Sequence, residues 1–90
     1  MPAPDQTEAA ETLALNALAF LAESAEALAR FVAASGLAPE SLSERAAEPE
    51  FLSAVLDFLL ADDELLVAFC ERQSLEPRFV HGARRILSGD

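Results

Sequence analysis

Apolar residues recur along this chain at the three- and four-residue spacing of amphipathic helices, and no segment alternates with the two-residue period of a strand. Two segments, 6–22 and 49–61, illustrate this pattern. Their apolar faces consist of Leu13, Ala17, Phe20 and Leu21 in the first, and of Phe51, Val55, Phe58 and Leu59 in the second. The pattern predicts an all-α protein.

Capping residues divide this pattern into six helices. Asp5 followed by Glu8 predicts a capping box at the start of the first helix. Ser24 and Asp62 have the short polar side chains that cap helix N-termini, and Gly36 is suited to end a helix. Proline favours the first turn of a helix and stands at Pro39, Pro49 and Pro77. We expect helices over about 6–22, 25–34, 39–47, 49–61, 63–74 and 77–87.

The remaining helices also have one apolar side each. These sides are Leu28, Phe31 and Val32 in the second helix, Leu42 in the third, and Leu65, Leu66, Phe69 and Cys70 in the fifth. In the sixth helix, we expect an inner face of Phe79, Val80, Ala83, Ile86 and Leu87. We expect all of these faces to meet in one core.

The chain also reads as two copies of one unit. A shift of 38 residues carries Phe20 to Phe58, Phe31 to Phe69, and Pro39 to Pro77. This period is typical of a helical supersecondary unit, and two units are too few for a solenoid. We therefore expect copies at about 7–45 and 45–83 to fold on each other. They would form a single domain over 1–90, a compact six-helix bundle with flexible ends at 1–4 and 88–90.

Two stretches, LNALAFLAE and RFVAASGLAPESLSERAAEPEFLSAVLDFLLADDELLVAF, resemble a family of short, mostly alphaproteobacterial proteins catalogued as a domain of unknown function. The resemblance covers about residues 10–87. It implies an all-helical protein of about this length, and it brings no catalytic residues to transfer.

The charge of the chain limits its partners. A net charge of −10, with six Arg and no Lys against sixteen acids, argues against nucleic acid and against anionic membrane surfaces. The start MPAPDQTEAAE lacks the basic and apolar regions of a signal peptide, and the longest apolar stretch is interrupted by acids. A single Cys allows no internal disulfide. We expect a soluble cytoplasmic protein.

Candidate catalytic and metal-binding residues are few. Cys70 aligns with Val32 in the repeat, which favours a buried apolar position over a nucleophile. The run from Asp62 to Glu64 fits helix capping, and one Cys with one His81 cannot form a zinc site. No nucleotide-binding or hydrolase motif occurs. We expect no enzymatic activity, no metal and no cofactor.

Two features indicate a partner surface. One is a basic cluster in the last helix, Arg78, His81, Arg84 and Arg85, whose repeat counterparts carry no positive charge. It either complements the negative end of the helix or docks an acidic partner. The other is Leu15 and Leu60, which lie opposite the apolar faces of their helices and belong either to a wide core or to an exposed patch.

The most economical function is therefore a non-enzymatic protein-interaction module. The candidate partner surface comprises Leu15, Leu60, Arg78, Arg84 and Arg85. The partner is an unknown protein or, in a weak homodimer, a second copy. The alternative is a carrier or sensor that binds a small apolar ligand between helices, with Asn16 as the one polar residue near a core face.

Overall fold

The computed structural model describes residues 6–89, and within this range it contains six α-helices and no strand. They are α1 Gln6–Ala22, α2 Ala25–Ser35, α3 Leu42–Arg45, α4 Pro49–Leu60, α5 Asp63–Gln73 and α6 Pro77–Ser88. The prediction of an all-α six-helix fold is confirmed. The third helix is shorter than expected, because its first turn is the 3₁₀ helix η1, Pro39–Ser41. The expected capping box at Asp5 and the ends 1–4 and 90 lie outside the described residues.

The helix boundaries follow from local hydrogen bonds. The Ser24 hydroxyl accepts a bond from the Ala27 amide, and Asp62 Oδ1 accepts one from the Leu65 amide, both at 3.2 Å. Each of these bonds satisfies one amide that the first turn of a helix leaves without a partner. At the other end of α2, Gly36 has φ of 74°, a backbone conformation that glycine adopts without steric cost.

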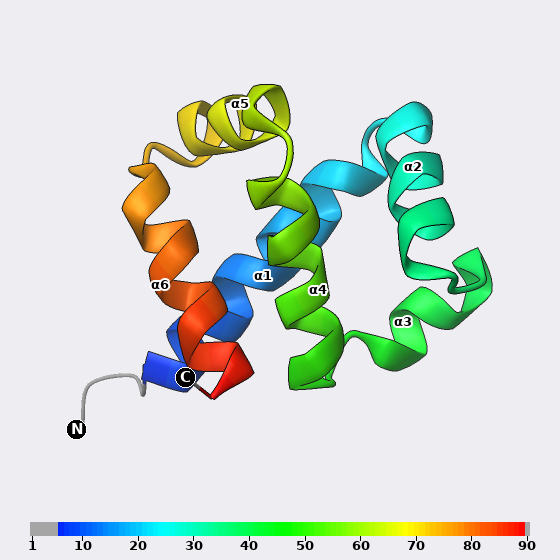
Figure 1. The fold of residues 1–90 in the computed structure, drawn as a ribbon, viewed down its shortest axis with the longest axis horizontal. Helices are drawn as coiled ribbons and strands as arrows, with labels where there is room; N and C mark the ends of the chain where they lie inside the picture. The colour runs from blue at the N-terminus through cyan, green and yellow to red at the C-terminus, as the bar shows by residue number, and fades with distance from the viewer. Residues whose placement is uncertain (1–5, 90) are drawn as a thin grey trace.

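Helix α4 lies at the centre of the molecule, in front of α1 in Figure 1, with α6 on one side and α2 and α3 on the other. Helices α1, α4 and α6 make the most extensive contacts with one another. Residues of α4 are consequently buried over much of its circumference. They include Phe51, Leu52, Ser53, Val55, Leu56 and Leu59. The single apolar face predicted for 49–61 was too narrow, because neighbouring helices cover α4 on several sides.

Two aromatic side chains connect the outer helices to this centre. Phe31 of α2 and Phe69 of α5 are both almost completely buried, as their predicted helix faces require. The radius of gyration is 12.5 Å, close to the value of about 12 Å expected for a compact domain of this length. The expected compact bundle is therefore what the chain forms.

Several local features recur 38 residues apart, although the duplication itself stays a prediction. Ser24 and Asp62 cap α2 and α5 in the same way, and Gly36 and Ser74 both adopt the left-handed conformation at the ends of these helices. The third helices of the two predicted copies differ. In the first copy, 39–45 is a 3₁₀ turn followed by a four-residue helix, whereas the corresponding α6 has 12 residues.

The predicted inner face of α6 was partly wrong. Val80, Ala83 and Leu87 are buried, but Phe79 and Ile86 remain 50% and 37% exposed. The physical reason lies in the opposing surface of α1, where the closely packed residues at the start of the helix are alanines such as Ala10. These methyl groups allow α6 to pack close to α1. They are too small to cover the larger side chains of Phe79 and Ile86, which lie at the edge of the contact between the two helices.

Candidate functional site

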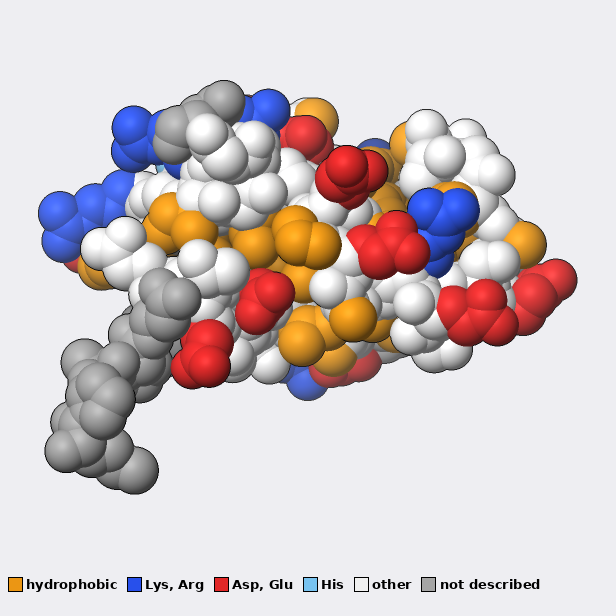
Figure 2. Space-filling view, turned by 90° about the horizontal axis from the view of Figure 1, so that it is seen from below, with side chains coloured by type: hydrophobic (Ala, Val, Ile, Leu, Met, Phe, Trp, Pro, Cys, Tyr) orange, Lys and Arg blue, Asp and Glu red, His pale blue; other side chains and the backbone are white. Residues whose placement is uncertain are grey.

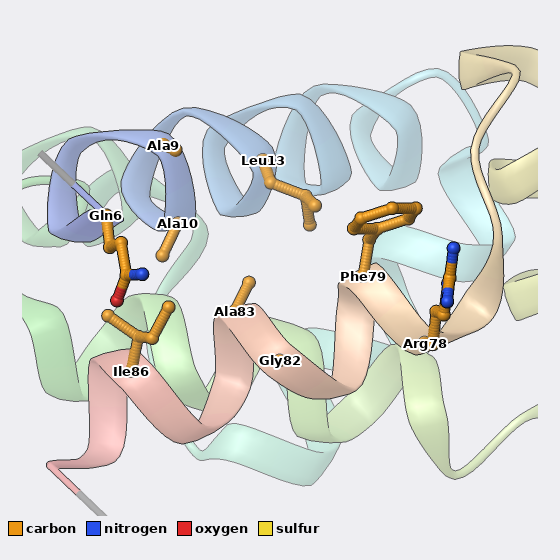
Figure 3. A pocket seen from close by; sticks show the side chains of 9 residues that line it. All are labelled: Gln6, Ala9, Ala10, Leu13, Arg78, Phe79, Gly82, Ala83 and Ile86. Carbon is orange, nitrogen blue, oxygen red and sulfur yellow. The ribbon is translucent and has the colours of Figure 1, made fainter. Parts of the chain in front are cut away.

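A groove runs along the surface between the first half of α1 and the length of α6 (Figure 3). Its volume is about 390 Å³. Seven of its nine lining residues are apolar or glycine. Among residues 6–89, the lining is Gln6, Ala9, Ala10, Leu13, Arg78, Phe79, Gly82, Ala83 and Ile86.

The groove is bounded by large side chains at its two ends and by small residues between them. Leu13 from α1 and Phe79 from α6 point toward one another at one end (Figure 3). Ile86 stands near Gln6 at the other end, and the floor between them contains Ala83 and Gly82. Because nothing larger than a methyl group projects from this floor, a hollow remains that is about two helical turns long.

The helical backbone at Gly82 does not require a glycine. Apart from its chain neighbours and the backbone of its own helical turns, a Cβ atom built there meets no atom within 4 Å, and the residue has no positive φ. Glycine in a helix interior costs about 1 kcal/mol relative to alanine. The fold therefore leaves the space above Gly82 empty although a methyl group would fit.

Phe79 connects the groove to a second apolar surface. The same ring lines a further hollow with Val67, Cys70 and Leu75 at the connection between α5 and α6. Val67 is 52% exposed, so two of the large apolar residues with the greatest exposure lie on either side of this connection. Apolar surface thus continues from the groove around Phe79 onto α5.

Arginines accompany this apolar surface. The Arg78 guanidinium carbon lies 5.0 Å from the centre of the Phe79 ring, and Arg78 also pairs with Glu76 at 3.3 Å. Arg85 is exposed and has no ion-pair partner among residues 6–89. Figure 2 shows a band of hydrophobic side chains across one face, with several Arg side chains at the end where α6 lies, and with acids and further Arg side chains elsewhere on this face.

The structure brings together only some of the predicted partner-surface residues. Arg78 lines the groove and Arg85 lies near it on α6, whereas Arg84 turns to α4 and binds Asp57 at 2.6 Å. Leu15 is 42% exposed, and Leu60 is half-buried against the core. Neither leucine lines the groove. That these two leucines belong to a partner surface stays a prediction.

Sequence reasoning missed Phe79, Ile86 and Gly82 as site residues. The available signal was the combination of a glycine in the middle of α6 with the alanine-rich first half of α1. Large side chains that face alanines on a neighbouring helix remain partly uncovered. That condition becomes apparent only when the pairing of α1 with α6 is known.

Cys70 and Asp62 have structural roles, and Asn16 lies away from the core. Cys70 is buried, as predicted, and burial raises the pKa of its thiol. Asp62 caps α5 and pairs with Arg30 at 2.7 Å, and the hydrogen bond from Arg30 lowers the pKa of Asp62, with a smaller effect from the Leu65 amide. Asn16 is exposed on α1 and does not face the core.

No three potential metal ligands come together within the described part of the chain. Nor does this part contain a helix whose length and apolar character would allow it to cross a membrane.

Comparison with models of protein families identifies the family of this chain. The family model described as "Protein of unknown function (DUF3572)" matches residues 7–90, and the chain therefore belongs to this family. No curated protein and no solved structure matches the chain.

Proposed function

We propose that this member of the DUF3572 family is a non-enzymatic protein-interaction module, and that its docking surface is the groove between α1 and α6. The observation that supports this proposal most strongly is the exposure of Phe79 and Ile86 at the two ends of one apolar hollow. Large apolar side chains exposed around a groove are typical of surfaces that bind another protein. A single cysteine allows no internal disulfide, and in keeping with this we propose that the module is cytoplasmic.

The length of the groove suits an α-helix. Phe79 and Ile86 are seven residues apart on α6, which corresponds to about 10.5 Å or two helical turns. Leu13 and Gln6 have the same separation on α1. A partner helix would place one bulky side chain over Gly82 and others beside Phe79 and Ile86, at the spacing of anchors in helix-in-groove complexes.

Gly82 adds a second argument. The helix would be more stable with alanine at this position, and the fold has room for it. A glycine that lowers stability without a conformational reason is expected where function requires open space.

A carrier of a small apolar ligand is the weaker alternative. The volume of the groove is large enough for a small molecule. The groove lies at the surface, however, where half of the Phe79 side chain is in contact with solvent. In the part of the chain that the structure describes, Gln6 and Arg78 are the only lining side chains that offer polar groups. A ligand site normally encloses most of its ligand and positions several polar groups around it.

Selection from a library of helical peptides tests the proposal. Peptides selected on the wild-type protein are then measured against F79S and, as the matched control, L15S, which changes a similarly exposed apolar residue of α1 that lines neither the groove nor the adjoining hollow. We expect F79S to weaken binding at least about tenfold and L15S to change it little. Peptides that bind all three proteins equally, or a selection that returns no binder, would refute the proposal.

A further inference from the structure

We propose that the partner of the groove is an amphipathic helix with Asp or Glu residues along the flank that faces α6. This inference rests on the proposed docking function and specifies the chemistry of the partner. The geometry that supports it is a basic stripe beside the apolar groove, on a chain that is otherwise strongly acidic.

The stripe consists of Arg78, His81 and Arg85, whose spacing of three and four residues puts them on one side of α6. All three side chains are exposed. The stripe lies directly beside the groove positions Phe79, Gly82 and Ile86, and α6 contains no acidic residue. A helix seated in the groove would therefore have one flank within reach of two arginines.

The opposite wall of the groove, formed by α1, carries no basic residue that could attract the acids of a partner helix. The outer flank of α1 beside the groove carries Ala9, Thr12 and Asn16, which are uncharged. The acidic Glu8 lies on the same flank, which therefore offers no positive charge to the acids of a partner. The two walls thus differ in charge, and this difference sets which way around a charged helix can lie.

A second copy of the chain fits the groove less well. Within residues 6–89, the large apolar side chains that are exposed are Leu15, Val67, Phe79 and Ile86. Leu15 and Val67 each stand alone on their helix, and the other two belong to the groove itself. A second copy therefore offers no exposed helix with the three apolar anchors that the groove can receive.

Two designed peptides test this inference. Each is a fluorescent amphipathic helix of about 18 residues, long enough to populate a helix, with leucines at positions i, i+4 and i+7. One peptide has three Glu along one flank, and the other has three Lys at the same positions. At about 150 mM salt the Debye length is about 8 Å, so charges close to the peptide outweigh the remote acids of the protein.

We expect the Glu peptide to bind about tenfold more tightly than the Lys peptide, although the protein carries a net charge of −10. The double variant R78Q/R85Q should lose this preference. R45Q should retain it, because Arg45 is an exposed arginine on α3, away from the groove. Raising the salt to about 500 mM should reduce the preference in the wild type.

The possible failures are distinguishable. If both peptides bind and the Lys peptide binds equally well or better, the inference of an acidic partner is overturned and the docking function stands. Failure of both peptides to bind would overturn the docking function as well. Concentration-dependent self-association of the peptide-free protein that F79S abolishes would identify a second copy as the occupant and overturn the inference.

Discussion

The ring of Phe20 in α1 packs against the ring of Phe69 in α5, with centroids 5.5 Å apart and planes inclined by 60°. A second pair, Phe31 in α2 and Phe58 in α4, has centroids 5.4 Å apart. The shift of 38 residues converts the first pair into the second, with the order of the partners exchanged. Reciprocal contacts of this kind are what a two-fold arrangement of duplicated units would produce.

The reciprocal pairs can be compared by double-mutant cycles. Leucine substitutions at Phe20 and Phe69, singly and together, should reveal a coupling free energy of about 0.5–1.5 kcal/mol in urea unfolding, the range for aromatic pairs. The cycle of Phe31 with Phe58 should agree within about 0.5 kcal/mol. Coupling in one pair and none in the other would argue against equivalent halves.

The sequence was sufficient to predict the helices and most of their ends. Ser24, Gly36 and Asp62 act through hydrogen bonds and backbone angles within a few residues, so their effect does not depend on tertiary contacts. The near-complete burial of Leu52 and Leu56 could not be predicted in this way. It depends on how many helices surround α4, which one apolar face does not determine.

Gly82→Ala tests whether the groove costs stability. The added methyl group projects into open space, and alanine favours the helix, so the free energy of unfolding should rise by about 0.5–1 kcal/mol. The same change should weaken the binding of any helix that uses the groove. Thermal unfolding and peptide titration of one variant measure both effects. A loss of stability would show that the floor of the groove is packed and not open.

Cys70 should be unreactive in the folded protein. Its side chain is buried, and its raised pKa reduces the thiolate fraction at neutral pH. A bulky thiol reagent should therefore label native protein far more slowly than protein unfolded in guanidinium. Cys70→Val should change the free energy of unfolding by no more than about 1 kcal/mol, because the volumes are similar. Equal labelling rates in both states would contradict this prediction.

Asp62 should make stability dependent on acid. Its pKa is lowered in the folded state, first by the hydrogen bond from Arg30 and then by the Leu65 amide. Its contribution is therefore complete above the unfolded pKa of about 3.9, and it is lost as the pH falls through the folded pKa. Asp62→Asn keeps the cap but removes the charge, so it should lower the urea midpoint at pH 7 and have less effect in acid.

Asp63→Asn is the control for this experiment. Asp63 lies in the same first turn of α5, is exposed, and its side chain makes no hydrogen bond or ion pair among the described residues. Its substitution should produce a smaller change than Asp62→Asn. If the two variants lower the urea midpoint equally, the acid dependence comes from negative charge at the start of α5 in general and not from the contacts of Asp62.

The candidate site was less predictable than the fold. The sequence indicated Arg78 and Arg85 because basic residues are rare in this chain. It assigned Phe79 and Ile86 to the inner face of the last helix, since periodicity does not specify which part of an apolar face a neighbour covers. Ala10 and Ala83 decide that coverage through their size, and this depends on the pairing of α1 with α6.

The most direct test of the groove as a docking surface is a map of amide chemical shifts in the protein on addition of the Glu peptide. We predict the largest changes along both walls of the groove, at Leu13, Phe79, Gly82 and Ile86, with little change in α2 and α3. Changes concentrated on α2 and α3, or around Leu15 and Leu60, would contradict the assignment of the groove.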